Sequence, residues 1–142
     1  MSRVYWDSML FIYLIDGNPA YAPRVKTIHE EMVRRGDRLC TSVFALGEVL
    51  TGPRKAGAHA VVDQIRQFFL DSRQVELLPF AAATSDRYSV IRSTTSAYSA
   101  DAIHLACAAE AGVDLFITHD KRLQKLTIPG IQFITGLETS LF

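Results

Sequence analysis

Short apolar segments alternate with helical patterns along the chain, and this alternation restricts the fold more than any other feature. The segments with strand character are 4–6, 38–41, 75–78, 115–118 and 131–134. Helical patterns cover Ser8–Ile15, Pro23–Arg35, Val43–Leu50, Ala58–Leu70, Ala81–Ile91 and Ser99–Gly112, with a helical turn at Asp120–Lys125. Strands that alternate with helices form parallel sheets covered by helices on both faces. We therefore expect an α/β fold of three layers, α/β/α, with a central parallel sheet.

Capping and turn residues set the predicted helix boundaries. Ser42 and Ser99 each precede a helical pattern and are predicted as N-caps. Gly52-Pro53 is predicted to end the helix before it, because proline interrupts helical hydrogen bonding. The segment 93–96, Ser-Thr-Thr-Ser, is predicted as a loop that leads into the helix at Ser99.

Length and charge limit the possible classes of protein. The 142 residues correspond to about one domain, so a single domain is expected over residues 1–142. Lysine plus arginine and aspartate plus glutamate number 15 each, so the formal net charge is zero. Binding to nucleic acid would therefore need a local basic patch. Candidates for this patch are Arg54, Lys55, Lys121, Arg122 and Lys125, for which ordinary surface charge is the alternative.

The cysteines and the apolar runs argue against several other classes. Cys40 and Cys107 form no Cys-x-x-Cys pair, so buried reduced thiols are expected in place of a zinc site or a disulfide framework. The apolar run Met9–Ile15 is too short to span a membrane, and Asp7 before it is atypical of a signal peptide. We therefore expect a cytoplasmic protein that does not act in a membrane.

Four acidic residues stand within or next to apolar segments, where a carboxylate costs desolvation energy unless it meets a cation, a donor or a metal. These residues, the acidic quartet, are Asp7, Glu48, Asp101 and Asp120. Two of them, Asp7 and Asp120, follow predicted strands, and ligands of parallel sheets bind beyond the carboxyl ends of the strands. One shared site would explain all four positions together.

Each member of the quartet also has a local explanation. Asp7 and Asp120 can cap the helical segments that follow them, and Asp101 can accept from free amides in the first turn of its helix. Glu48 can lie on a solvated helix face, although its neighbours are apolar. These explanations are independent of one another, whereas a single site accounts for the whole set.

Clustered carboxylates repel one another, so a site of this kind needs a cation to neutralise them. All-oxygen ligation without a cysteine or histidine set favours Mg²⁺ or Mn²⁺ over zinc. Such sites activate water and stabilise the attacking and leaving oxygens of a phosphodiester. The quartet therefore predicts metal-dependent phosphodiester hydrolysis.

The quartet lies in four characteristic segments. They are Asp7-Ser8, Ser42 to Glu48 as Ser-x-x-x-x-x-Glu, Asp101-Ala102-Ile103-His104-Leu105-Ala106, and Thr118-His119-Asp120-Lys121-Arg122-Leu123. Together they resemble the PIN domain family, and within it the VapC type of toxin ribonuclease from bacterial and archaeal toxin-antitoxin systems. The resemblance extends from Arg3 to about Ile134. It departs from the family at His119, where asparagine is common, and this affects a contact beside the metal site rather than the site itself.

The resemblance implies a PIN-like fold and roles for individual residues. The quartet would hold Mg²⁺ or Mn²⁺, while Thr118 and, less directly, Ser8 would place hydroxyls beside the metal-bound water or the scissile phosphate. Attack of water at phosphorus would leave a 5′-phosphate and a 3′-hydroxyl on the RNA. The family also implies a homodimer and a cognate antitoxin that blocks the cleft with an inserted segment.

Two histidines near the quartet have more than one interpretation. His104 shares a helix face with Asp101 at i, i+3 spacing, so it can move a proton or touch a phosphate, and the alternative is a histidine of the core or one that lies behind the site. His119 can meet the substrate or face solvent.

Other phosphate-handling classes fit the sequence less well. A phosphatase of the haloacid dehalogenase type needs a second aspartate two residues after the first, where Met9 stands. A receiver domain needs a phospho-accepting aspartate after a middle strand, but the segment 75–78 is followed by Pro79. The chain has no glycine-rich phosphate loop.

The sequence therefore predicts a Mg²⁺- or Mn²⁺-dependent endoribonuclease that is the toxin of a toxin-antitoxin pair. Two alternatives stay open. One is a PIN nuclease that processes RNA without being a toxin, and the other is a catalytically silent PIN-like scaffold that acts by binding a partner. Such a scaffold would be expected to lack an acid of the quartet, and all are present.

Overall fold

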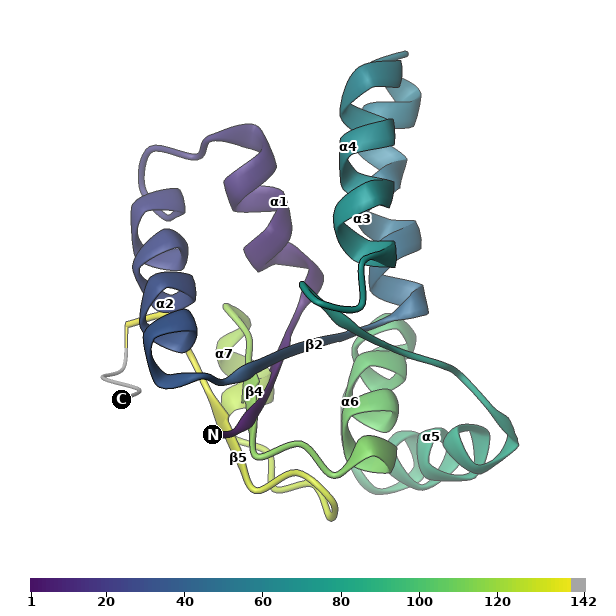
Figure 1. Cartoon of the computed structure of the whole chain (residues 1–142). Helices are drawn as coiled ribbons and strands as arrows, with labels where there is room; N and C mark the ends of the chain where they lie inside the picture. The colour runs from purple at the N-terminus through teal and green to yellow at the C-terminus, as the bar shows by residue number, and fades with distance from the viewer. Residues whose placement is uncertain (139–142) are drawn as a thin grey trace.

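A five-stranded parallel sheet forms the centre of the computed structural model, which describes residues 1–138. The strands are β1 (Arg3–Trp6), β2 (Arg38–Ser42), β3 (Glu76–Leu78), β4 (Leu115–Ile117) and β5 (Phe133–Thr135). The helices are α1 (Ser8–Asp16), α2 (Ala22–Arg35), α3 (Val43–Lys55), α4 (His59–Leu70), α5 (Ala82–Thr94), α6 (Ser99–Ala111) and α7 (Lys121–Gln124). The predicted three-layer α/β/α class with a parallel sheet is confirmed (Figure 1).

The order of the strands creates a natural binding position. The sheet order is β3-β2-β1-β4-β5, so the chain first winds outward from β1 to β3 and then crosses back to β4 on the other side of β1. The segments that follow β1 and β4 therefore leave the sheet in different directions. In parallel sheets a crevice opens at the carboxyl ends of two such strands, and ligands bind there.

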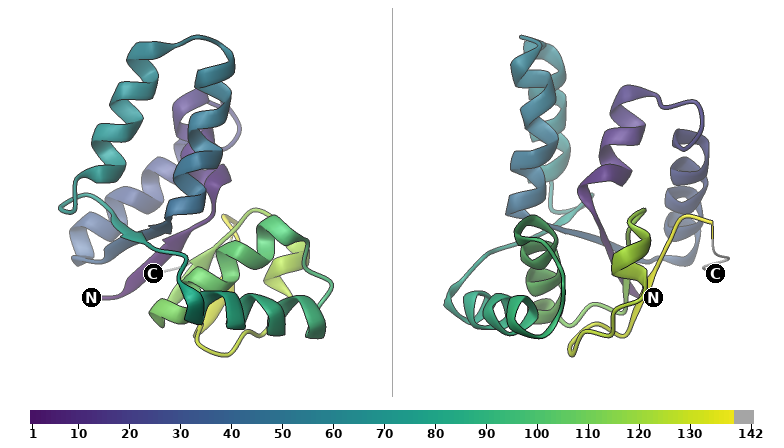
Figure 2. Two further views of the ribbon diagram at one scale, coloured as in Figure 1. Left: turned by 90° about the vertical axis from the view of Figure 1, so that its right-hand side faces the viewer. Right: turned by 180° about the vertical axis from the view of Figure 1, so that it is seen from behind.

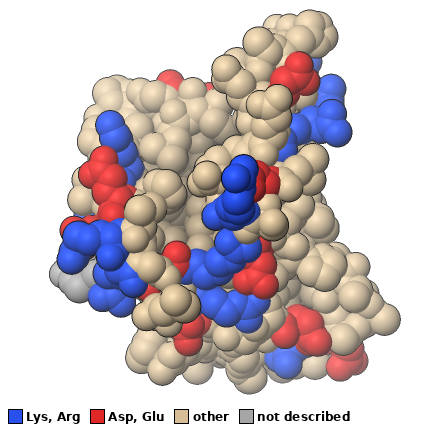
Figure 3. All heavy atoms as spheres, in the orientation of Figure 1, with Lys and Arg blue, Asp and Glu red and all other residues tan. Residues whose placement is uncertain are grey.

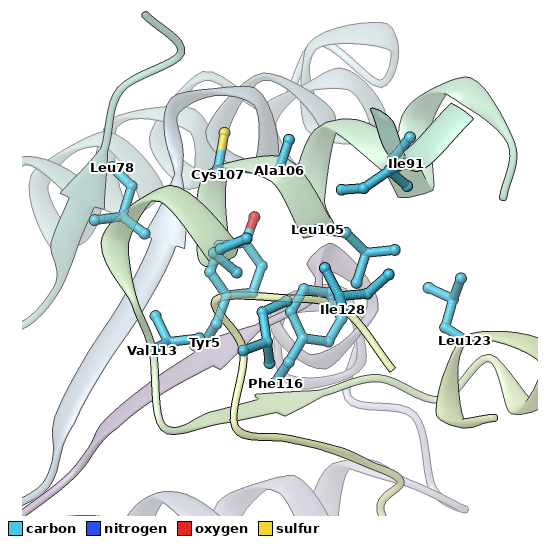
Figure 4. Close-up of a cluster of buried hydrophobic side chains, with 14 of the residues drawn as sticks. Tyr5, Leu78, Ile91, Leu105, Ala106, Cys107, Val113, Phe116, Leu123 and Ile128 are labelled. Atoms are coloured by element: carbon cyan, nitrogen blue, oxygen red, sulfur yellow. The ribbon is translucent and has the colours of Figure 1, made fainter. Parts of the chain in front are cut away.

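The period of two in the strands assigns side chains to the two faces of the sheet. In β1, Val4 and Trp6 join the apolar cluster formed with α1, α2, α3 and α4, whereas Tyr5 joins the cluster formed with α5 and α6. Figure 4 shows part of the second cluster, in which the rings of Tyr5 and Phe116 stack with centroids 4.8 Å apart. Both faces of β1 are therefore buried, as expected of a central parallel strand.

The helices of the two faces have different arrangements (Figure 2). Helices α3 and α4 run side by side and extend well beyond the sheet, while α1 and α2 form a second pair (Figures 1 and 2). On the opposite face α6 packs directly on the sheet and against α5. The buried part of α6 consists mainly of small residues, so this helix can approach the strands closely.

The predicted end of α3 at Gly52-Pro53 is wrong, because the helix continues to Lys55. Proline removes one amide donor, but α4 packs along α3 and holds this last turn in place. The amides of Ala56, Gly57 and Ala58 then bond to carbonyls of the final turn at 2.9–3.1 Å. Tertiary packing therefore outweighs the local effect of the proline.

The loop predicted at 93–96 begins later, because α5 extends to Thr94. The prediction of Ser99 as an N-cap is also wrong. Tyr98 occupies the N-cap position without a side-chain capping bond, and Ser99 is the first residue of α6. The Ser99 hydroxyl instead accepts a hydrogen bond from Arg92 of α5. The other predicted elements are present, with boundaries that differ by one or two residues.

Two further findings concern the sequence expectations. Cys40 and Cys107 are both buried and free. Across residues 1–138, no helix is long and apolar enough to cross a membrane.

Candidate active site

All four carboxylates of the acidic quartet line one pocket of about 500 Å³. The pocket lies at the carboxyl ends of β1 and β4, since Asp7 directly follows β1 and Asp120 is the third residue after β4. Glu48 reaches it from α3 and Asp101 from the first turn of α6. Residues that are far apart in sequence therefore meet where the strand order reverses.

Asp7 is the most buried member of the quartet, with 8% of the residue exposed. Its Oδ1 accepts from the amide of Ser8 at 2.7 Å, so it caps α1 as its local explanation suggested. Its Oδ2 accepts from the hydroxyl of Thr118 at 2.8 Å. Because these donors hold both oxygens, the Asp7 carboxylate has a fixed orientation at the carboxyl end of β1.

Thr118 links the two strand ends. It is fully buried, and its hydroxyl donates to Asp7 Oδ2 while it accepts from the amide of Asp120 at 3.1 Å. The hydroxyl therefore couples the positions of two members of the quartet. Thr118 is not among the residues that line the pocket, so in this arrangement it acts on the site through Asp7 and Asp120.

Two neighbouring side chains hold Glu48 through its Oε1 atom. Ser8 Oγ donates to it at 2.5 Å, and His104 Nε2 lies at the same distance. Burial alone would raise the pKa of Glu48, but the hydrogen bonds from His104 and Ser8 outweigh burial and hold the pKa below its ordinary value. Glu48 is therefore an ionised carboxylate at the wall of the pocket.

Asp101 and Asp120 share the guanidinium of Arg122 as a partner. Arg122 donates to Asp120 Oδ2 at 2.7 Å, and its Nη2 is 3.8 Å from Asp101 Oδ2. The guanidinium also lies over the ring of Tyr98, 4.5 Å from the centroid. The amide of Arg122 donates to Asp120 as well, so Asp120 caps α7.

The electrostatic environment differs between these two acids. Burial raises the pKa of Asp101, and the negative charges of Asp7 and Asp120 raise it further. The pKa of Asp120 is lowered, first of all by its hydrogen bond from the Arg122 side chain. Burial is the largest cause of the raised pKa of Asp101, and repulsion from the other carboxylates adds to it.

The sequence comparison assigns a family to this arrangement. A model of the PIN domain matches residues 4–129. The chain belongs to the PIN domain family. No curated protein is detectably similar in sequence.

Several solved structures share this fold, and the match extends over nearly the whole chain. The structure of VapBC2 from Rickettsia felis bound to a promoter DNA fragment matches with a TM-score of 0.74 at 15% identity, over 94% of this chain and 98% of that chain. The DNA-bound VapBC of Salmonella typhimurium matches with a TM-score of 0.73 at 19% identity, over 96% and 99%. The VapBC-1 structure from nontypeable Haemophilus influenzae gives 0.66 at 17% identity, over 96% and 99%. At these identities the similarity shows a common fold.

The donor atoms of this PIN domain suit a hard divalent cation. The pocket offers four carboxylates and the Ser8 hydroxyl without a thiol, and Mg²⁺ and Mn²⁺ prefer oxygen ligands. Within residues 1–138, no three His, Cys, Asp or Glu side chains are gathered closely enough to form a complete metal-binding group. Mg²⁺ commonly keeps several waters and takes only one or two carboxylates, so a partial protein shell of this kind fits it.

Two contacts at the site were not predicted from the sequence. One joins the Tyr5 hydroxyl to His104 at 2.7 Å, and the other joins Asp120 to Arg122, which was predicted to contact RNA or to be ordinary surface charge. The Arg122 contact had a signal in the sequence, since an arginine two residues after a helix-capping aspartate can fold back on it. The Tyr5 contact had none, because Tyr5 looks like any other strand residue.

The remaining sequence candidates lie around the pocket or away from it. His119 does not line the pocket; its Nδ1 is 2.6 Å from the hydroxyl of Tyr13. Lys121 and Arg122 of α7 adjoin the quartet, whereas Arg54 and Lys55 are at the far end of α3. Basic and acidic side chains are interspersed on the face seen in Figure 3, in keeping with the net charge of zero.

Proposed function

We propose that this PIN domain is a Mg²⁺- or Mn²⁺-dependent endoribonuclease and the toxin of a toxin-antitoxin pair. The observation that carries the proposal is the meeting of four carboxylates in one pocket at the reversal point of a parallel sheet. Membership of a family of nucleases supports hydrolysis of phosphodiester bonds. The toxin role is supported by the VapBC complexes that share the fold.

The residues of the pocket would divide the work of hydrolysis. The four carboxylates of the acidic quartet would hold the cation, because all of them line the pocket and the charges of Asp7 and Asp120 act on Asp101. The cation would neutralise the phosphate and make a water molecule a better nucleophile. Thr118 would keep Asp7 in its orientation, and Ser8 would do the same for Glu48. Cleavage at phosphorus would leave a 5′-phosphate and a 3′-hydroxyl.

An RNA cleavage assay tests this function. The purified protein is incubated with a mixed RNA pool and Mg²⁺ or Mn²⁺, and in parallel with a chelator, beside the variants Asp101→Asn and Asp63→Asn. Asp63 is exposed on α4 and lies outside the pocket, so Asp63→Asn makes the same substitution at a position away from the site. We expect metal-dependent cleavage that Asp101→Asn abolishes and Asp63→Asn retains. Cleavage in chelator, or by Asp101→Asn at the wild-type rate, would contradict the proposal.

The antitoxin of the proposed pair would bind at an apolar groove beside the pocket. This groove of about 420 Å³ lies between α1 and α4, and its lining includes Trp6, Phe11 and Phe68. Leu14 and Ile15 of α1 extend it, and both are more than a third exposed. An amphipathic antitoxin segment would cover the groove with its apolar face, and a further part of the segment would block the active-site pocket.

Co-expression with a candidate antitoxin tests this docking site. We expect Ile15→Glu to abolish co-purification of the complex and to leave RNA cleavage intact. Val33→Glu is the matched control, because Val33 is an exposed apolar residue of α2 outside the groove. Retention of the complex by Ile15→Glu would place the antitoxin elsewhere.

The proposal also includes a homodimer located in the cytoplasm, where RNA substrates occur. Sedimentation equilibrium of the isolated protein would measure the mass directly. A value twice that of the 15.8 kDa chain would support the dimer, and a value equal to it would contradict it.

A further inference from the structure

His104 is a buried polar residue that the proposed hydrolysis does not use. Only 2% of it is exposed, yet both nitrogens of its ring have partners. Nδ1 is 2.7 Å from the hydroxyl of Tyr5, and Nε2 is 2.5 Å from Glu48 Oε1. A continuous chain of hydrogen bonds therefore runs from the core side of β1 through α6 to the wall of the pocket.

The position of the proton on Nε2 follows from the chemistry of its neighbours. The ionised Glu48 carboxylate can only accept, so Nε2 must carry a hydrogen in this contact. Tyr5 is fully buried, and burial raises its pKa well above the ordinary value, so the hydroxyl keeps its proton and can donate to Nδ1. Each group in the chain then has a matching partner, as buried polar groups require.

The surrounding side chains leave the His104 ring little freedom. Phe44 meets it edge to face with centroids 5.4 Å apart, and Tyr5 does so at 5.9 Å. The ring therefore presents Nε2 to Glu48 in a fixed direction. Hydrogen bonds from neighbouring residues to a metal-binding side chain fix the geometry of metal sites in proteins in the same way.

The donors on Glu48 are unequally distributed between its oxygens. Oε1 receives both the Ser8 hydroxyl and His104, whereas Oε2 has no hydrogen-bond partner among the described residues. Glu48 lines the pocket, so Oε2 is the atom left to bind a ligand there.

We propose that His104 is a positioning residue, which with Tyr5 fixes Oε1 of Glu48 so that Oε2 is presented to a divalent cation in the pocket. This inference rests on the proposed function in taking the pocket as the cation site. His104 would then act on the site through Glu48, without contacting RNA.

Calorimetric titration with Mn²⁺ tests the proposal on the full chain. We expect His104→Phe to weaken Mn²⁺ binding about 10-fold, a typical cost of losing support for a metal ligand. His104→Gln keeps an N–H donor near the position of Nε2 and should recover most of the affinity. Tyr5→Phe keeps the ring in the core and removes only the hydroxyl, so a smaller loss is expected. Circular dichroism and thermal unfolding of each variant verify that it is folded.

A double-mutant cycle separates positioning from a general effect on the fold. In a Glu48→Gln background, His104→Phe should change Mn²⁺ affinity less than about twofold, because there is no carboxylate left to orient. Equal losses in both backgrounds would overturn the proposal. If His104→Phe does not fold, Tyr5→Phe in the same two backgrounds gives the same comparison.

A measurement without metal gives an independent answer. Nitrogen chemical shifts of ¹⁵N-histidine-labelled protein should show His104 Nε2 protonated, and an unprotonated Nε2 would overturn the proposal. Mn²⁺ binding by the wild type and by His104→Phe distinguishes the proposed function from the positioning role of His104. Wild-type protein that binds no Mn²⁺ would contradict the proposed function, whereas wild-type binding that is insensitive to His104→Phe would contradict positioning alone.

Discussion

The carboxylates of the pocket fall into two halves according to the partners that hold them, which are buried side chains in the inner half and an exposed side chain in the outer half. The inner half consists of Asp7 and Glu48, which accept hydrogen bonds from hydroxyls and a buried imidazole. The outer half consists of Asp101 and Asp120, whose partner is the guanidinium of Arg122, with 58% of its side chain exposed. The inner half is therefore fixed from the core, whereas the outer half depends on a side chain that can move into solvent. We infer that the inner acids have a fixed geometry, whereas the geometry of the outer acids depends on the position of Arg122.

The sharpest test of the inner half is Asp7→Asn. The amide keeps the size of the side chain and removes the charge, so the cation loses its most rigid ligand. We expect kcat/KM on RNA to fall at least about 100-fold, comparable to the loss of a principal electrostatic group in an active site. Rates on one defined RNA, with thermal unfolding to verify folding, would measure this. A variant with more than half of the wild-type rate would remove Asp7 from the site.

Thr118→Val tests whether the two strand ends are coupled as the structure indicates. The valine leaves a buried carboxylate oxygen and the Asp120 amide without their shared partner, which should cost about 1–3 kcal/mol of unfolding free energy. Cleavage should fall with it. Thr118→Ser retains the hydroxyl and should stay close to the wild type in both urea unfolding and activity. Equal behaviour of the two variants would show that the hydroxyl bonds are unimportant.

Arg122→Gln tests the outer half. Without the guanidinium, Mn²⁺ meets less positive charge, so its affinity should rise about 2- to 5-fold, the equivalent of an exposed ion pair. The salt dependence of RNA binding should decrease by about one unit of slope if Arg122 also contacts a phosphate. Arg66→Gln, on the exposed face of α4, is the control for the loss of one positive charge. Unchanged Mn²⁺ affinity would separate Arg122 from the cation site.

The smallest expected effect is on the stability of the metal-free protein. The pKa of Asp101 is raised in the folded state, so its contribution to stability is present below the unfolded pKa and is lost as pH rises through the folded pKa. Asp101→Asn should therefore be more stable than the wild type at pH 7 by up to about 1 kcal/mol, with the difference vanishing in acid. Urea unfolding from pH 3 to 7 in chelator measures it. A less stable variant at pH 7 would contradict repulsion within the quartet.

Local patterns were sufficient for the parts of the molecule that local chemistry determines. The alternation of strands and helices predicted the layers, and the acids after β1 and β4 predicted a pocket at the carboxyl edge of the sheet. The carboxylates also cap helices, as the local explanations had it for Asp7 and Asp120. Capping and membership of the site are therefore compatible, because each carboxylate oxygen has two lone pairs and can accept a hydrogen bond while it also binds a ligand.

Long-range packing determines what the sequence did not predict. The helix α3 passes Pro53 because α4 supports it, and Ser99 bonds to Arg92 of another helix instead of capping its own. The contact between Tyr5 and His104 joins residues 99 positions apart. No period or spacing marks such a pair, and only the packing of α6 on β1 brings the two side chains together.

The most direct test of the central claim is anomalous diffraction from crystals soaked in Mn²⁺. We expect an anomalous peak in the pocket, within coordination distance of Asp7 and Asp101 and with Glu48 Oε2 facing it. Crystals of Asp101→Asn under the same conditions should show a weaker peak or none. A peak outside the pocket, or an equal peak in the variant, would contradict the assignment of the acidic quartet as the metal centre of a nuclease.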